Sequence, residues 1–124
     1  MAKHEFTVET DPQYLAEQSD PAADRYVFAY TINVRNTGEV TAQLVSRHWI
    51  ITDANDRVQE VRGPGVVGEQ PILKPGESFE YTSGIPLETP VGRMRGSYQC
   101  VGEDGTAFEV PIAEFILAMP RTLH

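Results

Sequence analysis

The sequence predicts an all-β fold, an antiparallel sandwich or barrel of about seven strands, and three observations support this prediction. Apolar and polar residues alternate along most of the chain, which is the period of a strand with one buried face. The nine prolines and ten glycines fall between these segments as turn residues. No stretch has the apolar period of a helix. Strands at this spacing, joined by such turns, are typical of antiparallel layers.

The first strand is predicted from Glu5 to about Ala16, and the residues 18–24 form a surface connection. The clearest strand covers residues 24–37. One of its faces carries a continuous apolar set, which is Tyr26, Phe28, Tyr30, Ile32 and Val34. The remaining strands are predicted at residues 42–53, 57–62, 78–87, 92–101 and 106–119. A further short strand is compatible with this pattern.

In the strand at residues 42–53, strict alternation places Trp49 on one face together with Val45, Arg47 and Ile51, and Leu44 on the other. A tryptophan in this phase is predicted to anchor the core of a sandwich. The turns follow from residue type: a hairpin turn at residues 53–56, a type II turn at residues 74–77 and an Asp-Gly hairpin at residues 103–106. Pro111 predicts an edge strand or a bulge.

Length and charge limit what the protein binds. The 124 residues predict a single domain at residues 1–124. The net charge of −8 is spread evenly over both halves, which disfavours binding to nucleic acid or to an anionic membrane. No apolar run is long enough to span a bilayer, and the first residues do not resemble a signal peptide. Cys100 has no disulfide partner in the chain, so we expect a reducing, cytoplasmic location.

A glycine-rich stretch at residues 62–71 is the most informative local feature. Gly63, Gly65 and Gly68 have the spacing G-x-G-x-x-G, which cradles a pyrophosphate in dinucleotide-binding proteins. That use requires a helix opening directly after the glycines, because the helix N-terminus holds the phosphate. Pro71 follows too soon for a helix to open. We therefore interpret the stretch as a loop of a β-protein.

Three roles remain open for this loop. As an anion site, its backbone N–H groups converge on a phosphate or a nucleotide, with Arg57 and Arg62 adding charge-assisted hydrogen bonds. As a protein contact, the adjacent Val66 and Val67 point in opposite directions, so that one is buried and the other serves as an exposed anchor. As a structural bend, the glycines at positions 63, 65 and 68 allow a close approach of the backbone.

Neither a metal site nor a catalytic site is predicted. His4, His48 and His124 are far apart, and no pair of residues has the spacing of metal ligands. Ser46 and His48 share a strand face, but a third member and an oxyanion site are missing. Cys100 reads as an inert buried thiol. We therefore expect no enzyme activity and no cofactor.

Several stretches of the chain resemble the bacterial ApaG family. They run through residues 26–30, 48–53, 60–71, 73–77, 79–84, 92–98 and 115–117, and so cover nearly the whole chain. The most specific are the glycine-rich loop and the Tyr-Thr-Ser-Gly of residues 81–84. This resemblance implies a fibronectin type III-like, immunoglobulin-like β-sandwich without an established enzymatic activity.

The resemblance also suggests a function. The bacterial family is linked to cobalt tolerance and magnesium efflux, and similar domains occur in eukaryotic F-box proteins and in a polymerase-delta-interacting protein. It therefore implies a small, cytoplasmic, non-catalytic module that binds an unknown partner protein, as a monomer or a weak homo-oligomer. The alternative is nucleotide or pyrophosphate binding by the loop Gly63–Gly68. A weaker alternative is direct binding of a cation.

Overall fold

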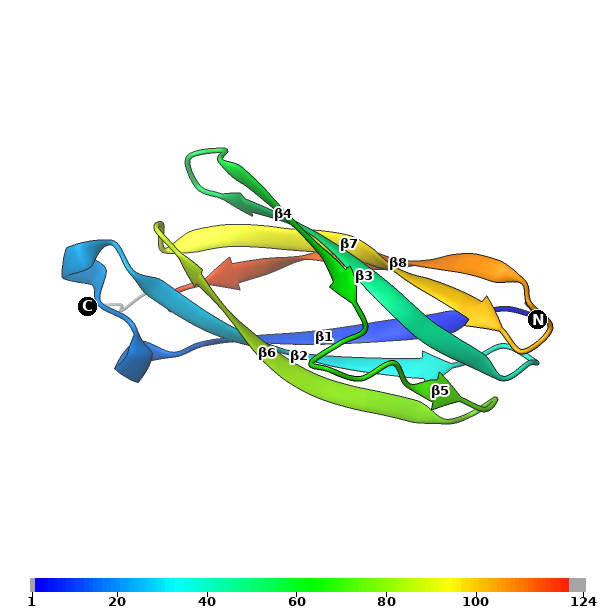
Figure 1. The fold of residues 1–124 in the computed structure, drawn as a ribbon. Coiled ribbons are helices and arrows are strands. Elements are labelled where there is room, and N and C mark those ends of the chain that lie inside the picture. The colour runs from blue at the N-terminus through cyan, green and yellow to red at the C-terminus, as the bar shows by residue number, and fades with distance from the viewer. Residues whose placement is uncertain (1, 121–124) are drawn as a thin grey trace.

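The computed structural model describes residues 2–120 as two antiparallel sheets packed face to face (Figure 1). The elements in chain order are β1 (Phe6–Tyr14), two short 3-10 turns η1 (Ala16–Gln18) and η2 (Pro21–Ala23), β2 (Tyr26–Asn36), β3 (Ala42–Asp53), β4 (Val58–Pro64), β5 (Ile72–Leu73), β6 (Ser78–Leu87), β7 (Val91–Gly102) and β8 (Ala107–Ala118). Among these residues, no helix has the length and apolar character needed to cross a membrane.

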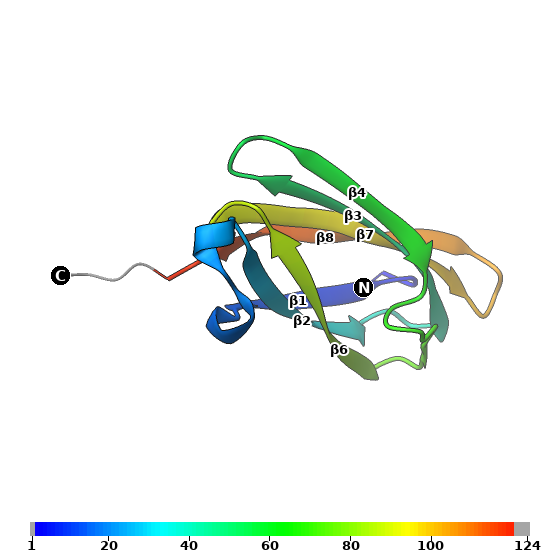
Figure 2. The same ribbon diagram turned by 60° about the vertical axis from the view of Figure 1, so that its left-hand side comes forward.

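The prediction of an antiparallel β-sandwich is confirmed. The smaller sheet has the order β1-β2-β6. The larger has the order β4-β3-β7-β8, with the two-residue β5 also pairing with β3. The flank at β1 is closed, because β1 lies along β8 of the other sheet. On the opposite flank, β4 stands away from the smaller sheet (Figure 2).

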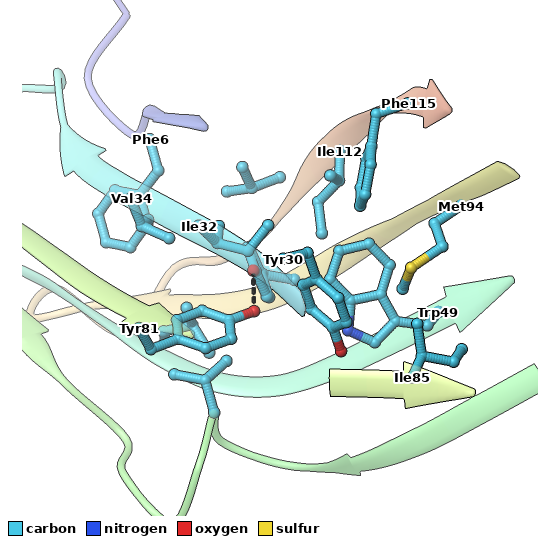
Figure 3. Close-up of a cluster of buried hydrophobic side chains, with 14 of the residues drawn as sticks. Phe6, Tyr30, Ile32, Val34, Trp49, Tyr81, Ile85, Met94, Ile112 and Phe115 are labelled. Atoms are coloured by element: carbon cyan, nitrogen blue, oxygen red, sulfur yellow. Dashed lines mark hydrogen bonds between the residues drawn. The ribbon is translucent and has the colours of Figure 1, made fainter. Parts of the chain in front are cut away.

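The core forms where the inward-facing residues of both sheets meet, and Trp49 of β3 is its anchor. The indole is 2% exposed and contacts the rings of Tyr30, Tyr98 and Phe115, each edge-on or nearly so (Figure 3). The Tyr81 and Tyr98 hydroxyls, one from each sheet, hydrogen-bond to each other in this core. Burial raises the pKa of Tyr81 to about 12, so the phenol stays protonated at neutral pH.

The predicted faces are wrong in the first part of β3, before Ser46. Leu44, placed outside by strict alternation, is fully buried. The cause is a β-bulge, because the pairing of β3 with β7 shifts between Leu44 and Ser46 and leaves Val45 as the extra residue. A bulge reverses the alternation for everything on one side of it. A second shift, between Met94 and Gly96, occurs where β7 pairs with β8.

The predicted turns are present. Glu77 N–H donates to the Lys74 carbonyl across the Pro-Gly turn, with Gly76 at a φ of 88°. In the hairpin turn after β3, the Asp53 carboxylate accepts hydrogen bonds from the backbone N–H groups of Asn55 and Arg57. Pro111 lies on β8, the edge strand opposite β4, as expected for a residue that cannot donate to a neighbouring strand.

The residues before β1 are tied to the hairpin between β7 and β8. The Asp104 carboxylate accepts a hydrogen bond from the Thr106 backbone N–H at 3.1 Å and contacts His4 Nε2 at 2.9 Å and Lys3 Nζ at 3.6 Å. The Thr106 amide and the His4 ring lower the pKa of Asp104 from 3.8 to about 2. This carboxylate therefore stabilises the fold when ionised.

We expect acid to remove this stabilisation. A carboxyl group whose folded pKa lies below its unfolded pKa stabilises the protein above pH 4, and the effect is lost as the pH falls toward 2. Asp104→Asn should therefore lower the urea midpoint at pH 6 and flatten its fall between pH 4 and pH 2. Equal slopes for the variant and the parent protein in this window would contradict the assignment.

Candidate functional site

The glycine-rich loop connects β4 to β5 and contains a tight two-residue turn. The backbone N–H of Val66 donates to the Glu69 carbonyl at 2.8 Å, and the N–H of Glu69 donates back to the Val66 carbonyl at 2.9 Å. Between them, Val67 and Gly68 have φ angles of 43° and 83°, both left-handed. This pair of conformations makes a hairpin turn of the primed type and does not begin a helix. The prediction that no helix opens here is confirmed.

Gly65 is required by the backbone of this turn. Its φ is 60°, and a Cβ atom at this position would lie 2.1 Å from the Glu69 carbonyl oxygen. The Gly65 N–H donates to the Val45 carbonyl, so the turn is tied to the bulged residue of β3. The predicted close approach of the backbone is therefore confirmed at this glycine.

The two valines of the loop point in opposite directions, as predicted. Val66 is 0% exposed and belongs to the core, whereas the neighbouring Val67 is 55% exposed. The loop thus inserts one side chain between the sheets and presents the other to solvent. This arrangement fits both the structural role and the role in protein contact.

Of the two arginines predicted to assist an anion site, Arg62 directly precedes Gly63 and is exposed, whereas Arg57 lies away from the loop. Arg62 is in β4 opposite His48, and Arg57 precedes β4 at the far end of that strand from the loop. The Arg57 guanidinium contacts the carboxylates of Asp53 at 2.9 Å and Glu88 at 2.7 Å. Its charge is therefore already balanced.

The arginine that contacts the loop is Arg47, which the motif did not indicate. Its Nη1 donates to the carbonyls of Pro64 and Gly65, both at 3.0 Å, and the guanidinium lies against Gly63. The sequence contained one indication of this contact, because alternation places Arg47 on the same strand face as the core residue Trp49. The loop therefore presents hydrogen-bond acceptors, the carbonyl oxygens of Pro64 and Gly65, to the guanidinium of Arg47.

A groove lies at the opposite end of β4, where the two sheets separate. It has a volume of about 540 Å³. Residues from η2, β3, β4 and the end of β6 line it, namely Ala23, Asp24, Arg25, Ile51, Asp53, Arg57, Val58, Gln59, Pro86, Leu87 and Glu88. Sequence reasoning missed this groove, because it is made by segments far apart in the chain.

Ser46 and His48, which share a strand face, each have a hydrogen-bond partner of their own. Ser46 donates to the Gln99 side chain at 2.8 Å, and His48 contacts Glu60 at 3.0 Å. Burial raises the pKa of Cys100 to about 12, which keeps the thiol protonated. In residues 2–120, no three His, Cys, Asp or Glu side chains gather as metal ligands would. His124 lies outside the described residues.

Comparison with known proteins gives strong matches over nearly the whole chain. Residues 16–102 match the family model described as the ApaG domain. Protein ApaG of Bordetella pertussis is 67% identical over 121 residues, which are 98% of this chain and 92% of that protein. Protein ApaG of Ralstonia nicotianae is 65% identical over the full length of both. A crystal structure of an ApaA protein from Bordetella pertussis matches with a TM-score of 0.95 and 65% identity over 98% of each chain.

Proposed function

Since this chain belongs to the ApaG domain family, we propose that it is a small, non-catalytic module that binds a partner protein. We class its sandwich with the fibronectin type III-like modules, in which loops and strand edges carry the binding residues. The binding surface is the outer edge of the larger sheet, formed by β4, the glycine-rich loop and β5.

One observation supports this edge above the others. Of the five large apolar side chains that are exposed in residues 2–120, three lie on it: Val58 at 62%, Val67 at 55% and Ile72 at 64%. An edge strand also presents unpaired backbone N–H and C=O groups, and proteins normally blunt such edges with charged residues. This edge carries the charged residues Glu60 and Arg62, but its exposed valines and isoleucine add an apolar surface that another protein can cover.

The hypothesis that the loop binds a nucleotide or a pyrophosphate has less support. Arg57 is paired with two carboxylates away from the loop, and Arg47 is bonded to the loop carbonyls. Of the arginines near the loop, only Arg62, which is exposed and directly precedes Gly63, is left to assist the backbone N–H groups in binding an anion. The hypothesis remains a prediction, and titration with ATP, GTP or pyrophosphate decides it through the amide resonances of Gly63, Gly65 and Gly68.

In this proposal, the role in cation handling belongs to the partner protein. The protein acts in the cytoplasm, and any effect on cobalt tolerance or magnesium efflux passes through the protein to which it is bound. This account needs no metal ligand in the chain.

Quantitative affinity capture from bacterial lysate tests the proposal. We expect Val67→Glu combined with Ile72→Glu to reduce the captured partner at least about tenfold, because each change places a charge in an apolar contact. The matched control is Ile116→Glu, at a side chain of similar exposure (54%) on β8, the other edge of the same sheet.

The control variant should capture as much partner as the parent protein. Equal capture by the double variant and the parent would contradict the proposed edge. A loss that is equally large with Ile116→Glu would also contradict it, because the binding surface would then lie on the other side of the sheet.

A further inference from the structure

On the flank opposite β1 and β8, the edge strands of the two sheets, β6 and β4, do not cover each other. β4 extends the larger sheet beyond β3, whereas the smaller sheet ends at β6, and within the described residues neither strand pairs with a second neighbour. The inner face of β4 is consequently poorly covered. Gln59 on this face is exposed and Val61 is half-buried, although both lie opposite buried residues of β3. Figure 2 shows β4 reaching past the smaller sheet.

Two buried aromatic side chains next to this uncovered face carry a hydrogen-bond donor, the indole N–H of Trp49 and the hydroxyl of Tyr30. Trp49 lies opposite Val61 and is 2% exposed, and Tyr30 is 7% exposed, with the ring centroids 5.6 Å apart. Within residues 2–120, the Trp49 indole N–H and the Tyr30 hydroxyl have no hydrogen-bond partner. Tyr30 lies opposite Ser83 of the edge strand β6, and Figure 3 shows its ring next to the Trp49 indole.

These two donors are reached by solvent. Every side-chain nitrogen or oxygen that is shut off from solvent in the described residues has a hydrogen-bond partner. The indole N–H and the phenol are therefore not fully shut off from solvent, and both can donate to an incoming acceptor. Buried donors of this kind favour a partner with carbonyl groups, because an unpaired polar group is costly once water is displaced.

The charges around the adjacent groove argue against an anion. Its lining contains the carboxylates of Asp24, Asp53 and Glu88 and the guanidinium groups of Arg25 and Arg57. Arg57 is already bonded to two of the three carboxylates. The groove thus has a surplus of one negative charge, in a protein whose net charge is −8. A neutral or basic occupant is favoured over a phosphate or a carboxylate.

We propose that an extended segment of the partner protein pairs with the free edge of β6 and covers the inner face of β4. One of its apolar side chains enters the groove against Ile51 and Leu87, and a lysine or arginine beside it meets the surplus carboxylate. Its backbone or side-chain oxygens accept hydrogen bonds from Trp49 and Tyr30. Pairing stops before Pro86, which has no N–H to donate. This inference rests on the proposed function, because it names the chemistry of the bound partner.

The tryptophan makes the proposal directly testable, because the chain contains a single one and its indole N–H gives a single resonance. The probe is a pool of acetylated and amidated heptapeptides. They alternate threonine with valine, leucine, isoleucine or phenylalanine and carry lysine at both ends. A matched pool carries glutamate at both ends. We expect the lysine pool to shift the indole resonance and the amides of residues 79–85, and the glutamate pool to bind at least about tenfold more weakly.

Variants on β6 and β2 locate the segment. Ser83 lies opposite Tyr30 and is half-buried, so Ser83→Leu should block binding by filling the space beside Tyr30. Thr82→Leu, one residue earlier on the exposed side of the same strand, is the matched control and should bind like the parent protein. Tyr30→Phe removes one hydroxyl group and should weaken binding about fivefold.

Several outcomes would overturn the inference. They are no indole shift at millimolar peptide, shifts confined to residues 65–68 or to the exposed face of the sheet, or equal effects of Ser83→Leu and Thr82→Leu. An indole shift that appears on raising the protein concentration without peptide would assign the edge to a second copy of this chain. Each of these results leaves the proposed function standing if Val67→Glu with Ile72→Glu still abolishes capture, so the two failures are distinguishable.

Discussion

Replacing Trp49 with alanine is expected to lower the free energy of unfolding by about 3–5 kcal/mol, the range for removing a large buried aromatic side chain. The indole is 2% exposed and contacts three aromatic rings from three strands, β2, β7 and β8. Neither sheet can close over the resulting cavity, because the surrounding side chains are fixed by strand pairing. Urea unfolding followed by circular dichroism measures the change, since the variant has no tryptophan fluorescence.

The control for this prediction is Trp49→Phe, which keeps an aromatic ring in the same place. We expect it to cost about 1–2 kcal/mol, because it leaves a smaller cavity. If Trp49→Ala lowered the free energy of unfolding by less than about 1 kcal/mol, the assignment of this residue as the core anchor would be wrong.

Gly65→Ala is expected to lower the free energy of unfolding by about 3 kcal/mol. Part of this cost is the left-handed backbone at a φ of 60°, which disfavours any residue with a Cβ atom by about 1–2 kcal/mol. The rest comes from the new methyl group, which would lie 2.1 Å from the Glu69 carbonyl oxygen unless the turn rearranges. The measurement is the urea midpoint, with the amide resonance of Val66 as a local reporter of the turn.

Gly68→Ala separates the two contributions. Gly68 also has a left-handed φ, at 83°, but a Cβ atom there meets nothing within 4 Å. We expect it to cost about 1 kcal/mol, the backbone part alone. If both variants were destabilised equally, the close approach at Gly65 would contribute nothing to stability. A loop retained for anion binding would instead predict that both glycines matter for a ligand and neither for folding.

The strands and turns were predictable because they depend on neighbouring residues. The alternation of apolar and polar residues predicted β2, β6 and the inward-facing residues of β3 that follow the bulge. Gly76 and Gly105 marked turns that need a left-handed backbone. The opposite directions of Val66 and Val67 followed from their adjacency alone. The loop was correctly excluded as a helix start by Pro71, which follows too closely for a helix.

The misplacement of Leu44 and the missed contacts have a common physical cause. The bulge at Val45 arises from the pairing of β3 with β7, and the residues 42–53 alone do not predict it. Which strand lies next to which is likewise set by long-range packing. For that reason the sequence did not reveal that Arg47 contacts the loop, that Arg57 is bonded away from it, or that β4 extends past β6.

The position of β1 along β8 has a consequence for how the protein is made. Synthesis proceeds from the N-terminus, so β1 leaves the ribosome about ninety residues before β8, the strand of the other sheet that lies along it. Until β8 emerges, β1 has no cover from the larger sheet on this flank and is exposed to chaperones or to neighbouring nascent chains. A ribosome that stalls before residue 107 would therefore hold a fragment prone to aggregation, whatever the stability of the completed molecule.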